Sequence, residues 1–107
     1  IYPINHGMVI KREIAEKHPW VILNLYKAFV KANEMAEKAR KNAIGYHLET
    51  GLLSADAGKA LATPLIQHGI AANRKVLETA AQYSFEQGLT PRLIKLDEIF
   101  APSTMEQ

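Results

Sequence analysis

The most regular pattern of apolar and polar positions in the chain predicts a long helix over residues 19–42. Pro19 suits the first turn of that helix, because its missing N–H has no helical partner there. The same proline ends a short helix predicted over residues 12–17, since the residue before a proline avoids the α region. Apolar side chains recur along the long helix every three or four positions and so share one face; they are Val21, Leu25, Ala28, Ala32, Met35 and Ala39.

Charged residues near the end of the long helix predict a solvated face rather than a binding patch. Glu34 precedes Lys38 by four positions, and Glu37 precedes Lys41 by four. Residues at this spacing are neighbours on a helix surface, and each pair contributes roughly 0.2–0.5 kcal/mol. We therefore expect both ion pairs on the outer surface of the helix.

Glycine, proline and capping residues divide the middle of the chain. Residues 45–51 begin and end with glycine and predict a break between helices. Ser54 is expected to cap a helix over residues 55–62, which Pro64 limits. Gly69 marks a further turn.

Similar signals predict two helices in the last third of the chain. Asn73 is expected to cap the first of them, and Gly88 followed by Leu89 fits its C-terminal end. Residues 92–96 read as a short extended or turn-like segment, and Asp97 is expected to cap a last helix over residues 98–100. The apolar stripe of the longer helix is formed by Val76, Leu77, Ala80, Ala81 and Ser84.

The β-branched stretch at residues 4–11 predicts the one strand of an otherwise helical chain. A strand needs neighbours for its N–H and C=O groups, and we expect them from a missing part of the chain, from another copy, or from residues 92–96. The expected fold is therefore mostly α with one N-terminal strand, the helices packing around it. Since the chain begins at Ile1 without an initiator Met, inside an apolar stretch, we expect a piece of a longer protein; the alternative is that only tag or disordered residues have been trimmed.

Composition narrows the classes of partner. The 107 residues fit one small domain, with 13 basic and 11 acidic side chains, a formal charge of +2 and no cysteine. This balance predicts no nucleic-acid partner and no anionic membrane partner. The absence of cysteine excludes disulfides and thiolate zinc sites. No apolar run approaches the ~20 residues that span a bilayer.

Three stretches resemble the 4,5-dihydroxyphthalate decarboxylase family of the type 2 periplasmic-binding-protein superfamily. The first is residues 1–12 (IYPINHGMVIKR), which is similar to a family strand that returns between lobes. The second is residues 16–29, with EKHPWV and LYKAF, which resembles a helix pair seen widely in solute-binding proteins. The third is residues 72–102, with ANRKVLE, EQGLTPR and EIFAP, which is similar to the C-terminus of the decarboxylases. The resemblance implies that residues 1–107 are a single C-terminal segment of a larger protein of two α/β lobes.

The resemblance also implies a reaction, namely the decarboxylation of an aromatic dicarboxylate. His6 is the expected catalytic acid, because histidine titrates near neutral pH; the alternative is that it only satisfies backbone groups in a bend. Asn5 is expected to hydrogen-bond a ring hydroxyl, and Gly7 to allow close approach of the backbone. The implied protein is cytoplasmic, uses no cofactor or metal, and binds a small aromatic carboxylate. This chain alone is expected to be inactive and to associate, either with missing lobes or as a homo-oligomer.

The other candidate chemistry is weaker. His18 reads as a helix-end residue and His68 as an exposed turn residue, while His47 and Glu49 lack a third metal ligand at suitable spacing. Two other functions remain open from the sequence. One is a solute-binding protein of a nitrate-, sulfonate- or taurine-type transporter, and the other is an independent helical interaction module.

Overall fold

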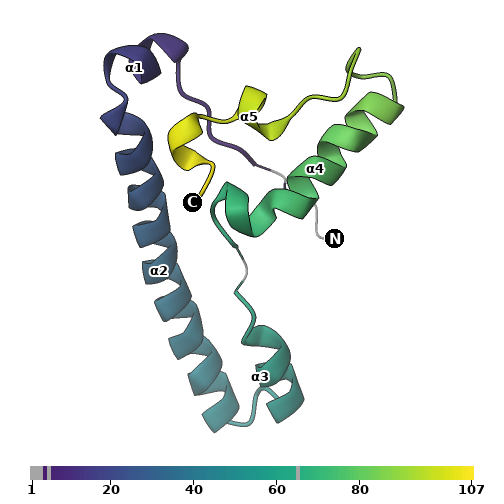
Figure 1. Cartoon of the computed structure of the whole chain (residues 1–107). Helices are drawn as coiled ribbons and strands as arrows, with labels where there is room; N and C mark the ends of the chain where they lie inside the picture. The colour runs from purple at the N-terminus through teal and green to yellow at the C-terminus, as the bar shows by residue number, and fades with distance from the viewer. Residues whose placement is uncertain (1–3, 5, 65) are drawn as a thin grey trace. The chain divides into compact units, whose positions relative to one another are not determined.

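A computed structural model of the chain describes residues 4, 6–64 and 66–107. Its elements are α1 (Arg12–Lys17), α2 (Trp20–Glu49), α3 (Ala55–Leu61), α4 (Ile70–Glu86), α5 (Leu96–Ile99) and the 3₁₀ turn η1 (Pro102–Thr104) (Figure 1). The structure is 66% helical, and none of the residues it describes belongs to a β-strand. The chain forms two compact units, Ile1–Leu25 with His68–Gln107, and Tyr26–Gln67.

The predicted N-terminal strand is wrong. In the described part of residues 4–11 the backbone is irregular, and its residues make no hydrogen bond with other described residues before Lys11, whose carbonyl accepts from Ile14 and Ala15. Val9 is 93% exposed and Met8 is 57% exposed. The β-branched residues Ile4, Val9 and Ile10 therefore do not make a strand where no second strand pairs with them. The α/β fragment expected from the resemblance is not seen either, and only the mostly helical part of that prediction fits.

The start of α2 was predicted correctly to within one residue, but its end was not. The helix continues through Gly45 and ends at Glu49, so the predicted break at residues 45–51 is wrong over most of its length. A glycine inside a helix destabilises it by only about 1 kcal/mol relative to alanine, and the packing of the neighbouring turns can offset this cost. The chain leaves the helix at Gly51, whose φ is 73°. This left-handed conformation is one that glycine adopts without steric cost.

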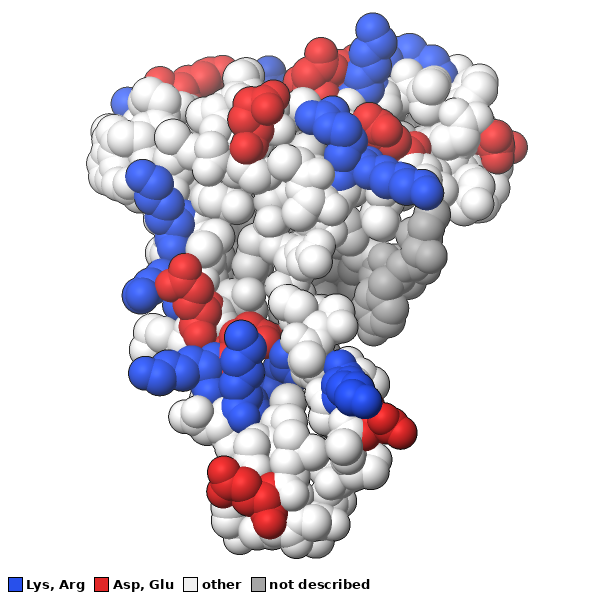
Figure 2. All heavy atoms as spheres, turned by 60° about the horizontal axis from the view of Figure 1, so that its bottom comes forward, with Lys and Arg blue, Asp and Glu red and all other residues white. Residues whose placement is uncertain are grey.

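The ion pairs on α2 are also not the predicted ones. Glu34 pairs with Lys31 at 3.1 Å, and Glu37 pairs with Arg40 at 2.7 Å, both at a spacing of three residues. Lys38 and Lys41 form no ion pair with the described residues. Positive and negative side chains are interspersed on the face of the molecule shown in Figure 2.

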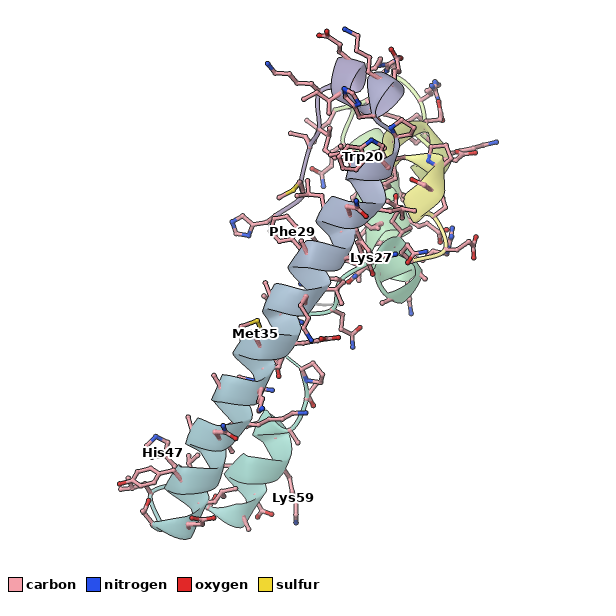
Figure 3. All side chains as sticks on the ribbon, turned by 90° about the vertical axis from the view of Figure 1, so that its left-hand side faces the viewer. Trp20, Lys27, Phe29, Met35, His47 and Lys59 are labelled. Atoms are coloured by element: carbon pink, nitrogen blue, oxygen red, sulfur yellow. The ribbon has the colours of Figure 1, made fainter. Side chains whose placement is uncertain are left out.

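The unit Tyr26–Gln67 places α3 beside the C-terminal part of α2 (Figures 1 and 3). Ser54 caps α3 as predicted, since its Oγ accepts a hydrogen bond from the Ala57 N–H at 3.2 Å. At the other end of α3 the Arg40 guanidinium donates to the Leu61 carbonyl at 2.6 Å and to the Thr63 carbonyl at 3.2 Å. These bonds attach the end of α3 and the segment after it to α2.

In the other unit, α4 begins at Ile70 and not at a cap formed by Asn73. Gly69 is the N-cap residue, with φ 99°, and the Asn73 side chain donates to the Gly69 carbonyl at 2.8 Å from within the helix. The predicted C-terminal end is confirmed. Gly88 has φ 72°, its N–H bonds the Phe85 carbonyl, and the Leu89 N–H bonds the Ser84 carbonyl. This is the Schellman arrangement, which satisfies the last carbonyls of a helix.

The last helix starts earlier than predicted, at Leu96, so Asp97 lies in its first turn and does not cap it. The Glu98 carboxylate accepts from the Lys95 N–H at 3.0 Å, which satisfies a free N–H at the helix start. The same carboxylate accepts two bonds from the Arg92 guanidinium. Among the described residues, the buried apolar side chains are Ile70 and Leu96, 5% and 6% exposed.

Glu98 gives a pH-dependent prediction. The hydrogen bonds from Arg92, and then the bond from the Lys95 backbone, lower the pKa of Glu98 from 4.5 to about 2. Because the folded pKa lies below the ordinary value, ionised Glu98 stabilises the fold above pH 4.5, and this stabilisation is lost as the pH falls from 4.5 towards 2. We expect Arg92→Gln to return the pKa of Glu98 towards 4.5, measured by NMR titration of its side-chain carboxyl carbon.

A matched control for this measurement is Arg74→Gln on α4. Arg74 lies 3.7 Å from Glu78 in another exposed ion pair, so its loss should leave the Glu98 titration unchanged. An unaltered Glu98 titration in Arg92→Gln would show that the guanidinium does not set this pKa.

Candidate functional site

The candidate site at the N-terminal end of the chain consists of Asn5, His6 and Gly7, of which Asn5 lies outside the described residues. His6 is exposed and forms no hydrogen bond with the described part of the chain. Gly7 is also exposed, and a methyl group added to it would meet no atom within 4 Å. The segment therefore leaves the imidazole of His6 and the backbone at Gly7 open to a ligand.

This structure gives His6 no preorganised partner for proton transfer. General acid catalysis requires the donor to lie within hydrogen-bond reach of the reacting atom, and usually a second group orients the donor. The described residues supply no such orienting group, because His6 has no hydrogen bond to a carboxylate or carbonyl among them. What residues 6 and 7 provide is an accessible proton donor beside an unobstructed backbone.

Within the described part of the chain, no hydrogen bond or ring contact joins the other histidines to this segment. His18 follows α1 and lies edge-on to Trp20, with ring centroids 6.2 Å apart. His47 lies in the last turn of α2, and the centroid of its ring is 5.5 Å from that of the Tyr46 ring. In the described ranges, no group of three or more His, Asp or Glu side chains is placed to hold a metal ion.

An apolar hollow between α4 and the segment 90–100 is the feature that the sequence did not reveal. It has a volume of about 210 Å³. The α4 side contributes most of the stripe predicted from the sequence, but the other wall comes from side chains of residues 90–100, beyond the end of the helix. It is lined by Leu77, Ala80, Ala81, Ser84, Thr90, Ile94, Leu96, Ile99 and Phe100.

The hydroxyl of Thr90, beside this hollow, is buried without a hydrogen bond to the described residues. The Thr90 N–H bonds the Ser84 carbonyl at 3.3 Å. A buried polar group without a partner costs about 1–3 kcal/mol. The oxygen is also closed off from the hollow, since it has almost no accessible surface. The hollow therefore offers a ligand apolar contacts and no reachable polar anchor at Thr90.

No helix in the described part of the chain is long and apolar enough to cross a membrane. The sequence matches no protein-family model, and no solved structure matches it significantly. It is similar to a 4,5-dihydroxyphthalate decarboxylase from Comamonas testosteroni, with 23% identity over 109 aligned positions. The alignment takes in 99% of this chain and 33% of the decarboxylase, so the chain spans about a third of that relative's length and is distantly related to it.

Proposed function

We propose that residues 1–107 are the C-terminal segment of a larger two-lobed protein that removes a carboxylate from an aromatic dicarboxylate. The observation that carries this proposal is the alignment of nearly the whole chain to one third of a 4,5-dihydroxyphthalate decarboxylase. An alignment that covers one protein fully and the other partly is what a shared segment of a longer protein produces. The rest of the active site would then come from outside these residues.

The chemistry of the proposed reaction defines what this segment must supply. The bond between the ring and the carboxylate carbon breaks and CO₂ leaves. The electron pair of that bond stays on the ring carbon, which then takes a proton. A hydroxyl para to the leaving group can feed electron density into the ring, so an acid placed near that carbon is the main requirement. Groups that hold the carboxylates should bind the ground state no more tightly than the transition state.

His6 is the residue of this chain that we assign as the acid. Its side chain is exposed and free of hydrogen bonds to the described residues, so a substrate can reach it. Asn5 is assigned to a ring hydroxyl, and Gly7 to close approach of the substrate to the backbone, which the empty space around it supports. No cofactor enters this scheme, because the ring hydroxyl and the acid together suffice for the electron and proton movements.

A chimera tests the proposal directly. The segment of the Comamonas testosteroni decarboxylase that aligns with this chain would be replaced by residues 1–107, and CO₂ release from 4,5-dihydroxyphthalate would be measured. We expect turnover by the chimera and none by the isolated chain. A chimera that melts cooperatively like the parent enzyme but releases no CO₂ would contradict the assignment. Turnover by the isolated chain would instead contradict the incomplete site.

A further inference from the structure

The unit Tyr26–Gln67 has no buried residue among those that the structure describes. Helices in proteins owe most of their stability to the packing of an apolar face against other elements. Units of about 40 residues usually need a disulfide, a metal or a partner in addition. The chain has no cysteine, and its described residues form no metal cluster. The pair of α2 and α3 therefore lacks a core of its own.

The large apolar side chains that α3 leaves uncovered lie on one side of α2. At 3.6 residues per turn, Phe29, Met35 and Tyr46 fall on the same side of the helix and are all exposed. Figure 3 shows Phe29 and Met35 on the side of α2 away from α3. No charged residue falls between them on that side, where the intervening positions are the alanines 32, 36, 39 and 43. We call this surface the α2 outer face.

The size of the α2 outer face argues against a second copy of the chain as its cover. Between Phe29 and Tyr46 the helix rises about 26 Å, and a helix is about 10 Å wide. Two copies of the face would therefore bring together roughly 500 Å² of helix surface, whereas stable complexes between separate chains bury about 1,200–2,000 Å². A cover that belongs to the same polypeptide needs less area, because the linkage holds it at an effective concentration of about 1 mM.

We infer that the α2 outer face packs against the upstream two thirds of the proposed longer protein. This contact rests on the proposed function, because the alignment covers 99% of this chain and only 33% of the decarboxylase and so leaves the other two thirds outside. The fitting partner is an apolar surface without charges that encloses Phe29, Met35 and Tyr46. The alanines between them allow its backbone to come close, since helix packing distances depend on the side chains at the contact.

Thermal melting of the chimera with the Comamonas testosteroni decarboxylase tests this contact. Met35→Glu should lower the melting temperature by about 5–10 °C, because it places a carboxylate under an apolar cover. Met35→Gln keeps much of the shape without the charge and should lower it by less. In the isolated chain Met35 is 66% exposed, so Met35→Glu should leave the helix content measured by circular dichroism unaltered.

Lys38→Glu is the matched control, because it places the same carboxylate on the charged side of α2. Lys38 is exposed and forms no ion pair with the described residues, so the melting temperature should change by less than about 2 °C.

Equal melting temperatures of the Met35→Glu, Met35→Gln and parent chimeras would overturn the inference, as would a chimera that does not melt cooperatively. A natural chain that dimerises alone, and loses the dimer in Met35→Glu, would overturn it by assigning the face to a second copy. Failure of the proposed function has a different signature, namely a chimera that melts cooperatively and responds to Met35→Glu but releases no CO₂.

Discussion

Replacing His6 by alanine in the chimeric decarboxylase is expected to lower kcat by about 10²–10⁴-fold, the usual contribution of a positioned general acid. KM should change much less, because the imidazole is assigned to proton transfer in the transition state and not to holding the carboxylates. The stability of the protein should be unaffected, since His6 is exposed and makes no hydrogen bond with the described residues. Steady-state CO₂ release and thermal melting of the same preparations check both parts.

Two control variants make this result specific to position 6. His18→Ala removes an exposed histidine that contacts Trp20 at the end of α1, and it should retain activity close to that of the parent chimera. His6→Gln keeps much of the size and hydrogen-bonding capacity of the side chain but removes the imidazole that is assigned to proton transfer. If His6→Gln or His6→Ala released CO₂ as fast as the parent chimera, His6 would have no catalytic role.

The local features of the fold could be predicted because their causes lie within a few residues. Ser54 caps α3 through a bond from a backbone N–H three residues away. Gly88 ends α4 because its left-handed backbone lets the N–H groups of residues 88 and 89 bond carbonyls of the last turn. The position of Pro19 between α1 and α2 has the same local character. Each of these signals depends on steric or hydrogen-bonding rules that act along the chain.

The predictions that failed depended on partners far away in sequence. A β-branched segment becomes a strand only when a second strand pairs with it, so residues 4–11 could not be settled from their own composition. Gly45 was predicted to lie in a break, yet α2 continues through it, and the carbonyls of Leu61 and Ile66 accept hydrogen bonds from side chains of the same helix. The hollow beside α4 was unforeseen for a related reason, since one of its walls comes from residues 90–100.

The hydrogen bonds of the Arg40 guanidinium are a long-range contact that fixes α3, and nothing in the local sequence predicts them. The guanidinium donates to Glu37 on its own helix and to carbonyls 21 and 23 residues further along the chain. Arg40 and Glu37 have side chains that are only 17% and 16% exposed. The Leu61 carbonyl belongs to the last residue of α3, where helices have unsatisfied carbonyls and favour a positive charge.

Arg40→Ala is therefore expected to lower the free energy needed to detach α3 from α2 by about 1–3 kcal/mol. Glu37 loses its charge partner, and the carbonyls of Leu61 and Thr63 must bind water instead. The effect should stay below that of a fully buried pair, since Leu61 and Thr63 are exposed and can be hydrated. The amides of Ala55–Leu61 should exchange with solvent deuterium roughly 10–100-fold faster, while those of α4 keep their rates.

Lys59→Ala is the control, because it removes only an exposed ion pair. The Lys59 side chain is 80% exposed and pairs with Asp56, so its loss should change the exchange rates in α3 little. Equal exchange rates in the two variants would mean that the apolar contact of Leu48 with Gly58, and not Arg40, holds α3 in place.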